Sequence, residues 1–334
     1  MPLELDDLRG LAATISCRVS SSSSGFHRHS FSCSQYSVKY KHEKAHDEGI
    51  WCCAWGKHEI NGVEYVMTGA LDNGLKLWKW MDNHLEFLRS CEGHRLGVIS
   101  VDINASGTMA ASSSQDNQIR FWDLESGRLL KTYEGNPADT WTIAFSPDSR
   151  FVATGSHTGC VNMIGVESGR KESAIQLDGK FIYSLAYSPD GTRLAAGAIS
   201  GIVSICDLQT GNVRPLDGHA MPVRALAFSP DGQFLASTSD DKQIKVFDVH
   251  DGRNVISALN GHKGWVVSVQ FSPDMRHLAT SSTDGTVRVW DLSSKQEKHA
   301  FSEHEGQIWC SRYSPCGTKL ISVGDDRTVV VYNV

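Results

Sequence analysis

A unit of 41 to 44 residues recurs seven times along this chain of 334 residues. Most copies open near a Gly-His pair and close on an aromatic residue, as between Gly261-His262 and Trp290-Asp291. Repeats of about 40 to 45 residues with these two ends are typical of four-stranded propeller blades. The seven copies therefore predict an all-β, seven-bladed β-propeller.

Short apolar runs and tight turns alternate within each copy, as the four strands of a blade require. In Thr286–Trp290 and Arg327–Tyr332, β-branched and aromatic residues recur at period two, which is typical of strands. Turns related to Ser-Pro-Asp-Gly separate the first two runs, for example at Ser188–Gly191 and Ser229–Gly232. Proline presets the backbone of such a turn, and glycine tolerates its unusual dihedral angles.

The two ends of the chain meet in the predicted ring. Val334 ends the third strand of the last blade, so that blade lacks its outer strand. The run Tyr36–Tyr40 has strand character and would supply the missing strand, which closes the ring. We therefore predict a propeller over residues 35–334. Residues 1–34 hold five consecutive serines and little periodic hydrophobicity, which predicts a disordered N-terminal extension.

The composition indicates a reducing compartment and argues against direct nucleic-acid binding. Nine cysteines lie scattered without a Cys-x-x-Cys pair, and several fall inside predicted strands, where they act as small apolar residues. The net charge is −6, and no long Lys/Arg cluster offers a stripe for nucleic acid. His27, His29 and Cys33 lack a fourth ligand at zinc-site spacing, and the chain has no long apolar run. We therefore expect no metal, no cofactor, no membrane contact and no direct nucleic-acid binding.

Five copies repeat one set of histidine, hydroxyl, aspartate and aromatic side chains. A Ser-His-Asp catalytic site is needed once, whereas this set recurs at fixed spacing, so we interpret it as structural and predict no enzyme activity. The aspartate would accept from the histidine ring and from turn amides, the hydroxyl would bridge, and tryptophan would donate its ring N–H. The predicted tetrads are His46, Thr68, Asp72 and Trp78; His94, Ser112, Asp116 and Trp122; His219, Ser237, Asp241 and Phe247; His262, Thr280, Asp284 and Trp290; and His304, Ser322, Asp326 and Tyr332.

The third and fourth copies lack this set. They carry Thr158 and Ser200 at the place of the turn aspartate, and Ile164 and Cys206 at the place of the aromatic residue. We therefore expect the loops of these two blades to have a lower local stability than those of the other five.

One position of the repeat varies in a way that indicates binding. The residue five places after the opening histidine falls where the innermost strand begins, facing the central channel. It reads Trp51, Ile99, Trp141, Tyr183, Arg224, Val267 and Trp309, although aromatic residues make up only 9% of the chain. Trp, Tyr and Arg dominate binding hot spots. Packing between blades would also use such rings, but a purely structural position would hold similar residues in every copy.

The residues just before the turn aspartate reach the same end of the ring. Among them, Leu71 and Ile199 are apolar where a solvated turn would prefer polar residues, and Asp240 and Asp325 would attract a basic side chain. With Trp51, Trp141, Tyr183, Arg224 and Trp309, they predict a groove with an aromatic floor and acidic flanks. Such a groove suits a short segment of another protein that carries an apolar anchor and an arginine.

Several segments resemble the small WD-repeat propeller subunit that the superkiller (Ski) complex shares with the RNA polymerase II-associated factor (Paf) complex. The resemblance covers residues 35 to 334 and excludes residues 1–34. The Ala-Met-Pro that follows Gly218-His219 and the degenerate third and fourth copies are its more distinctive features. Its segments are Ala45–Trp51, Gly93–Asp102, Trp141–Ser149, Gly165–Gly169, Gly179–Ile182, Asp217–Arg224 and Ser322–Asp326.

The resemblance implies a monomeric, non-enzymatic scaffold in the nucleus and cytoplasm. In the superkiller complex, such a subunit binds a tetratricopeptide-repeat protein beside an RNA helicase that feeds messenger RNA to the exosome for 3′-to-5′ decay. In the Paf complex, it accompanies transcription elongation and supports histone modification. The resemblance also implies that Trp51, Trp141, Arg224 and Trp309 contact partners. A histone-peptide reader and a substrate receptor of a ubiquitin ligase remain alternatives.

Overall fold

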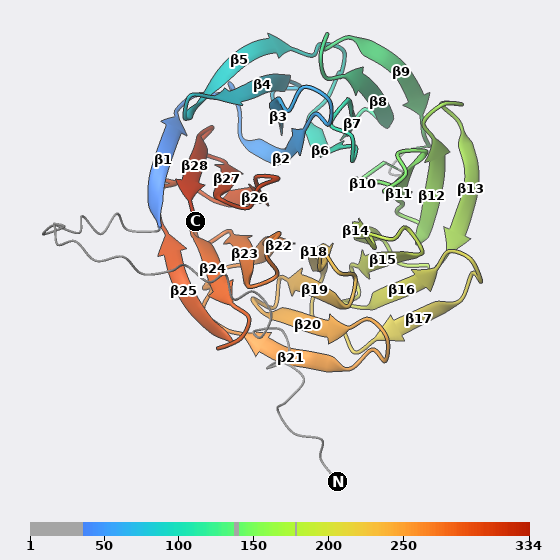
Figure 1. The fold of residues 1–334 in the computed structure, drawn as a ribbon. Helices are drawn as coiled ribbons and strands as arrows, with labels where there is room; N and C mark the ends of the chain where they lie inside the picture. Colours follow the sequence, from blue (N-terminus) through green and yellow to red (C-terminus); the bar gives the residue numbers. More distant parts are fainter. Residues whose placement is uncertain (1–35, 137–139, 178) are drawn as a thin grey trace, which may run out of the picture. The chain divides into compact units, whose positions relative to one another are not determined.

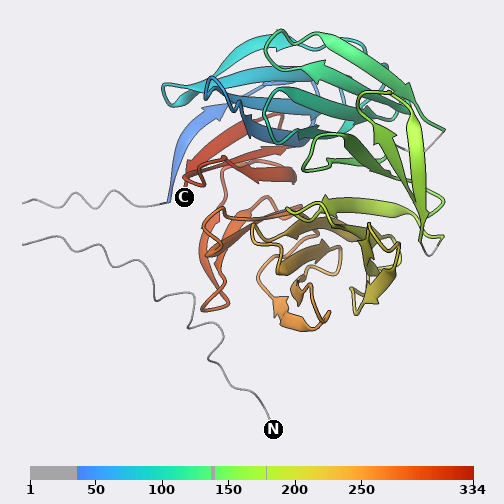
Figure 2. The same ribbon diagram turned by 45° about the vertical axis from the view of Figure 1, so that its right-hand side comes forward.

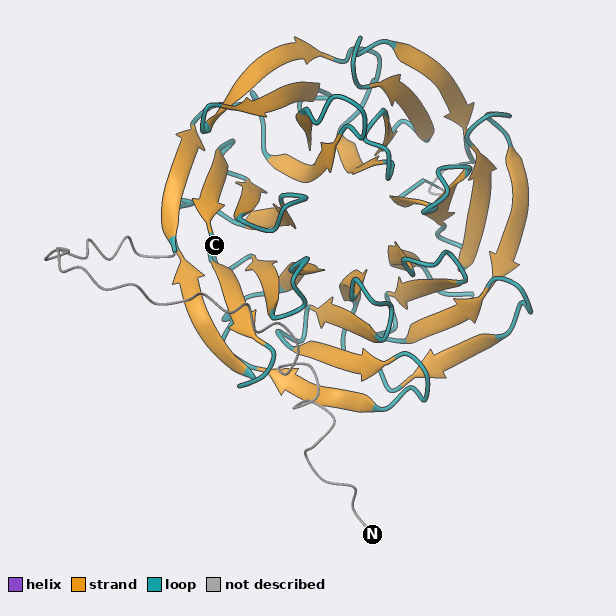
Figure 3. Ribbon diagram, in the orientation of Figure 1, coloured by secondary structure: helices purple, strands orange, loops and turns teal. Residues whose placement is uncertain are grey.

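The computed structural model describes residues 36–136, 140–177 and 179–334. The described residues contain 28 strands and no helix (Figure 3). They therefore include no helix of the length and apolarity that a membrane crossing requires. The predicted N-terminal extension, residues 1–34, lies outside the described residues.

The strands form seven antiparallel sheets of four strands each, which we number as blades 1 to 7 (Figure 1). The predicted seven-bladed propeller is thus confirmed. Blade 1 comprises β2 (Ile50–Lys57), β3 (Glu64–Ala70), β4 (Leu75–Met81) and β5 (His84–Ser90). Blade 2 comprises β6 (Val98–Ile103), β7 (Met109–Ser114), β8 (Gln118–Asp123) and β9 (Leu129–Glu134), and blade 3 comprises β10 (Thr142–Phe145), β11 (Phe151–Gly155), β12 (Cys160–Gly165) and β13 (Lys171–Gln176). Blade 4 comprises β14 (Ile182–Tyr187), β15 (Arg193–Ala198), β16 (Val203–Asp207) and β17 (Val213–Leu216), and blade 5 comprises β18 (Val223–Phe228), β19 (Phe234–Ser239), β20 (Ile244–Asp248) and β21 (Asn254–Leu259). Blade 6 comprises β22 (Val266–Phe271), β23 (His277–Ser282), β24 (Val287–Asp291) and β25 (Gln296–Phe301), and blade 7 comprises β26 (Ile308–Tyr313), β27 (Lys319–Gly324), β28 (Val329–Asn333) and β1 (Ser37–His42).

The innermost strands of neighbouring blades contact one another around the whole ring. These contacts run from β2 through β6, β10, β14, β18 and β22 to β26, and β26 contacts β2 again (Figures 1 and 2). The core consists of seven buried apolar clusters, one in each interface between two blades. In blades 1 and 7, for example, Trp78 and Val331 share one cluster. Each blade is therefore stabilised mainly by burial against its two neighbours.

Strand β1 supplies the outer strand of blade 7, as Tyr36–Tyr40 predicts from the sequence. It pairs antiparallel with β28, and the register runs from Ser37 opposite Asn333 to His42 opposite Val329. The ring of Tyr36 stacks on that of His299 with 5.0 Å between centroids. The two ends of the folded ring are thus joined by one ladder (Figure 1).

Candidate protein-binding surface at the channel mouth

Each predicted tetrad is assembled by hydrogen bonds at one end of its blade. In blade 2, Nδ1 of His94 lies 3.0 Å from Asp116, and Nε2 lies 2.8 Å from Oγ of Ser112. The ring N–H of Trp122 donates to the same Ser112 oxygen at 2.8 Å. Asp116 also accepts from the amide of Arg95 at 2.9 Å. The tetrad therefore ties the loop that enters the blade to the turn between its second and third strands.

The other four tetrads repeat this geometry, with two differences at the aromatic position. Phe247 has no N–H to donate, and Tyr332 uses its hydroxyl, 3.1 Å from Oγ of Ser322. The histidine contacts to aspartate and hydroxyl are 3.1 and 2.8 Å for His46, 2.9 and 2.7 Å for His219, 3.0 and 2.8 Å for His262, and 2.9 and 2.7 Å for His304.

The protonation of the tetrads follows from these contacts. Burial lowers the pKa of His94 despite the hydrogen bond to Asp116, so the imidazole is neutral at pH 7. Burial raises the pKa of Asp72, but hydrogen bonds from His46 and from turn amides outweigh it and bring this pKa to about 2. A neutral histidine donates from Nδ1 to the aspartate and accepts from the hydroxyl at Nε2. The hydroxyl is then fully engaged and buried, so it is no available nucleophile.

Blades 3 and 4 close their corresponding turns locally. In blade 3, Oγ of Ser156 lies 2.9 Å from Oγ1 of Thr158, and it accepts from the amides of Thr158 and Cys160 at 3.2 and 3.1 Å. In blade 4, the amide of Gly201 donates to the carbonyl of Ala198 at 3.1 Å. These contacts join residues of one turn. Between two loops, blade 4 has a backbone link, in which the amide of Ile199 donates to the carbonyl of Phe181, whereas a tetrad adds side-chain hydrogen bonds.

The central channel opens at the tetrad end, and all five predicted aromatic and arginine residues line it. The channel has a volume of about 670 Å³. At its mouth the residues gather in two groups, which come from different blades. The first, which we call the aromatic–arginine cluster, consists of Trp141, Phe181, Tyr183, Arg224 and Trp265. The second, the tryptophan pair, consists of Trp51 and Trp309.

Ring contacts run continuously through the aromatic–arginine cluster. The centroids of Trp141 and Tyr183 lie 5.8 Å apart, and those of Phe181 and Tyr183 lie 4.7 Å apart. The guanidinium carbon of Arg224 lies 4.7 Å from the Tyr183 centroid and 5.2 Å from the Trp265 centroid. These are cation–π distances, so the cluster holds a cation between two aromatic rings.

Asp240 is already paired with a basic side chain of its own chain. Its two carboxylate oxygens accept from Nε and Nη2 of Arg224, both at 2.7 Å. Asp240 is only 6% exposed. Burial lowers the pKa of Arg224, but the hydrogen bonds and charge of Asp240 outweigh it and raise this pKa. Asp240 therefore orients Arg224, and both of its carboxylate oxygens are already engaged within the chain.

The tryptophan pair has a similar internal brace. The rings of Trp51 and Trp309 lie 5.6 Å apart at 45°, and Nε1 of Trp309 donates to the exposed carboxylate of Asp325. Trp309 and Asp325 are 16 residues apart, as are Arg224 and Asp240. The two variable positions of the repeat are therefore neighbours in space, and their side chains brace each other in blades 5 and 7.

The remaining predicted residues lie on the rim of the mouth. Leu71 is half-buried, and a Cβ at Gly97 would come within 2.9 Å of its Cδ2 atom. Ile199 is 42% exposed, and its amide donates to the carbonyl of Phe181 at 2.8 Å. Leu71 and Ile199 therefore do not join the two ring clusters, although Ile199 adjoins Phe181.

Phe181 and Trp265 were missed by the sequence prediction. Both lie two residues before the variable position at the start of the innermost strand, which holds Tyr183 in blade 4 and Val267 in blade 6. Side chains two apart in an extended segment point to the same side, so the period-two rule would have found them. Trp265 is 42% exposed and widens the aromatic surface toward solvent.

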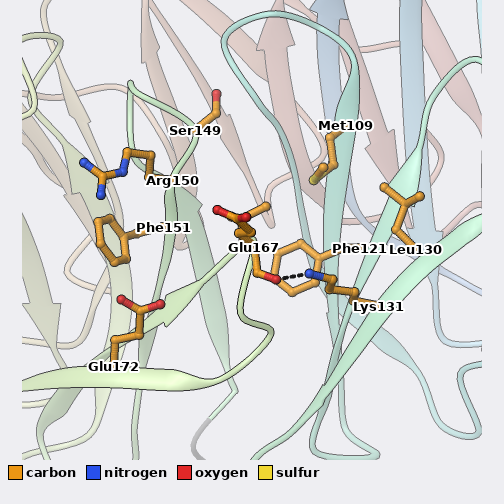
Figure 4. Close-up of a pocket in the computed structure, with 10 residues that line it drawn as sticks. Met109, Phe121, Leu130, Lys131, Ser149, Arg150, Phe151, Glu167 and Glu172 are labelled. Atoms are coloured by element: carbon orange, nitrogen blue, oxygen red, sulfur yellow. Dashed lines mark hydrogen bonds between the residues drawn. The ribbon is translucent and has the colours of Figure 1, made fainter.

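A second cavity, of about 520 Å³, lies between blades 2 and 3 (Figure 4). Phe121 and Phe151 line it, and the ammonium of Lys131 donates to the backbone carbonyl of Glu167 (Figure 4). It involves none of the tetrad or mouth residues. In the described part of the chain, no group of three or more His, Cys, Asp or Glu side chains is arranged to hold a metal ion.

Comparisons with known proteins agree with the repeat architecture. The family model described as the IFT122 first beta-propeller matches residues 64–333, and the model of the WD domain, G-beta repeat, matches residues 37–79. WD repeat-containing protein SL1-17 of Schistosoma mansoni is 66% identical over 297 residues, which cover 89% of this chain and 99% of that protein. WD repeat-containing protein VIP3 of Arabidopsis thaliana is 33% identical over 105 residues, or 31% of this chain. Superkiller complex protein 8 of Dictyostelium discoideum is 32% identical over 104 residues, or 30% of this chain, and each of the last two matches covers 32% of the relative.

Proposed function

Because the chain belongs to the family of WD-repeat propellers, we propose that it is a non-enzymatic scaffold that holds partner proteins at its channel mouth. The observation that carries this proposal is the pair of braced aromatic groups, the aromatic–arginine cluster and the tryptophan pair, at one end of the ring. Trp, Tyr and Arg are the residues that most often supply binding energy at protein interfaces.

The braces reduce the entropy that binding would cost. Asp240 fixes Arg224 through two hydrogen bonds, and Asp325 fixes Trp309. Each side chain that is already ordered spares about 0.5–1.5 kcal/mol when a partner arrives. The mouth is therefore pre-organised to receive a segment of another protein.

The residue types expected in that segment follow from the rings and the carboxylate oxygen that the channel mouth leaves available. The rings of Trp141, Trp265 and Trp309 offer apolar surface for an apolar anchor. Asp325 is exposed, and its second oxygen stays available for a basic group, whereas Asp240 is satisfied by Arg224. A partner segment would therefore place its apolar anchor over the rings and its arginine beside the tryptophan pair.

The proposed partners come from the family resemblance. They are the tetratricopeptide-repeat protein and the RNA helicase of the superkiller complex, which acts in exosome-linked mRNA decay, and subunits of the Paf complex, which acts in transcription elongation. Support comes from the motifs at Ala45–Trp51 and Asp217–Arg224 and from the likeness to Superkiller complex protein 8. Work in both complexes would place the protein in the nucleus and in the cytoplasm.

A histone-peptide reader is less well supported than a scaffold. Such a reader would need several free carboxylates to hold a basic tail. The Arg224–Asp240 pair removes one of them and adds a cation beside the channel. We therefore keep histones, and likewise adaptors of ubiquitin ligases, as outcomes of the test.

Affinity purification with mass spectrometry tests the proposal. The Trp141→Ala/Trp309→Ala variant should lose the superkiller and Paf subunits that wild type retains, because each change removes a hot spot of about 2 kcal/mol or more. Leu130→Ala is the matched control, since Leu130 is 48% exposed and lies at the cavity between blades 2 and 3. If the partners stay bound to the double variant, the binding surface does not lie at the channel mouth. Histones or ligase adaptors in place of the named subunits would overturn the assignment to these complexes.

A further inference from the structure

Three cysteines line the channel wall below the tryptophan pair. Cys53 on β2 and Cys310 on β26 face each other across the interface that closes the ring between blades 1 and 7, whereas Cys52 on β2 packs toward blade 2. Cys53 and Cys310 belong to the same core cluster. All three are free thiols.

Cys53 and Cys310 are in direct contact. Sγ of Cys310 lies 3.6 Å from the backbone oxygen of Cys53, to which its thiol can donate. Cys310 is 6% exposed toward the channel, whereas Cys53 is fully buried. A small molecule that enters the channel would therefore reach Cys310 before Cys53.

Arg312 adds a positive charge beside this pair. It follows Cys310 by two residues on β26 and lines the same channel. Its Nη1 atom donates to Oγ of Ser268 and to the carbonyl of Ser311, both at 2.9 Å, which holds the guanidinium in place. A fixed cation next to a thiol favours the thiolate, which is the nucleophilic form.

The three thiols differ in acidity. The interaction with Cys53 lowers the pKa of Cys310, and the charge of Arg312 lowers it further, against the effect of burial. Burial raises the pKa of Cys53 and likewise that of Cys52. Cys310 is thus the thiol of the three whose pKa is lowered and which most readily forms a thiolate.

We propose that Cys310 is a site of oxidation by hydrogen peroxide that enters through the channel, with Cys53 as the resolving thiol. The thiolate sulfur of Cys310 attacks one peroxide oxygen and breaks the O–O bond. This step forms a sulfenic acid and releases hydroxide, which leaves as water after taking a proton. The sulfur of Cys53 then displaces the hydroxyl group from Cys310, and its proton joins that group as a second water. Two thiols are oxidised to one disulfide by two electrons, and one peroxide is reduced to two waters.

The disulfide would join residues 257 positions apart, across the interface that is otherwise closed by noncovalent contacts. A cross-link over so long a loop restricts the unfolded chain strongly. Oxidised protein should therefore melt at a higher temperature than reduced protein, and dithiothreitol should reverse the shift.

Peptide mapping of the full-length wild-type protein tests this site. After treatment with hydrogen peroxide and blocking with iodoacetamide, we expect a linked peptide containing Cys53 and Cys310, with Cys52 alkylated. Exposed Cys316 serves as the internal reference for an accessible thiol. If Cys316 is oxidised while Cys310 remains alkylated, or if Cys52 is linked instead, the proposal is wrong.

Two single variants separate the steps. Cys53→Ser should accumulate the sulfenic acid, which dimedone captures on Cys310, and Cys310→Ser should abolish both the adduct and the shift in Tm. Cys52→Ser is the matched control and should behave as wild type. Dimedone labelling of Cys52 in the Cys53→Ser variant would contradict the assigned roles.

Discussion

Aspartates serve two different purposes in this ring, and their surroundings distinguish them. Asp284 accepts from His262, from the amides of Lys263 and Thr286, and from the Thr286 hydroxyl, so both of its oxygens are engaged. Asp325 is exposed and accepts one bond from Trp309. A substitution should therefore cost stability at the first site and binding at the second.

Asp284→Ala should destabilise the protein, while Trp309→Ala should leave it folded. The first change orphans buried donors, at a cost of roughly 1–3 kcal/mol for each unsatisfied group. The second removes a half-buried ring at the mouth. Thermal melting of both variants measures the difference, which we expect to exceed about 5 °C. Equal losses of Tm would mean that the tryptophan pair is core packing and that the proposed binding surface is wrong.

The tetrad histidines should make the fold sensitive to acid. Burial lowers the pKa of His94, His219 and His262 below 6.5. Below this pH, the unfolded chain therefore binds more protons than the folded chain does. Stability is then complete above pH 6.5 and is lost as the pH falls toward the folded pKa values, by up to about 1.4 kcal/mol per pH unit for each histidine. The tetrad aspartates also lower the stability at acid pH, because the pKa of Asp72 is lowered from 3.8 to about 2.

Equilibrium denaturation at pH 7.5 and 5.5 measures this effect. The free energy of unfolding should be smaller at pH 5.5, with a net uptake of protons on unfolding. A free energy of unfolding at pH 5.5 that equals or exceeds the value at pH 7.5 would contradict the neutral state of the three histidines.

The sequence predicts the tetrads well because their spacing is fixed by strand length. His262, Thr280 and Asp284 keep their separations in the other blades with a tetrad, apart from the longer first hairpin of blade 1. The pairing of Arg224 with Asp240 was not predicted, because both residues were assigned to a partner. Their separation of 16 residues, repeated by Trp309 and Asp325, depends on the bulged start of the innermost strand, which composition does not reveal.

At the scale of the element, blades 3 and 4 differ from the rest in how their loops are held. Ser156 and Thr158 bond within one turn, whereas a tetrad links that turn to the loop entering the blade. The strands themselves keep the same four-stranded pairing. The substitutions therefore remove the tetrad without changing the strand pairing of the blade.

Hydrogen exchange should report this difference. Amides in the turns at Thr158 and Ser200 should exchange about tenfold faster than those at Asp116 and Asp284, because one lost network hydrogen bond is worth about 1 kcal/mol or more. The innermost strands of the same blades serve as controls and should exchange slowly. Equal protection in all seven turns would show that the tetrads do not set local stability.

At the scale of the whole molecule, the repeat predicts the blades, and the chain ends predict how the ring closes. Each apolar cluster needs residues from two blades, so no blade is complete until its neighbour is present. The closing ladder between β1 and β28 is the only ladder of the described residues that joins strands from opposite ends of the chain. Sequence reasoning identified this strand within about two residues, because Tyr36–Tyr40 alternates like a strand and blade 7 lacked one.

Removing β1 should destabilise all seven blades together. Tyr40 packs against the cluster between blades 7 and 1, and five residue pairs hold β1 to β28. Their loss should cost roughly 4 kcal/mol or more from hydrogen bonds and apolar burial, or a fall in Tm on the order of 10 °C. A chain that begins at Glu43 tests this by thermal melting, and one that begins at Gln35 is the control. Because the ring is closed, the loss should appear as one cooperative transition at a lower temperature. A second transition confined to blade 7, or a Tm equal to that of the control, would show that the interfaces between blades close the ring without the ladder.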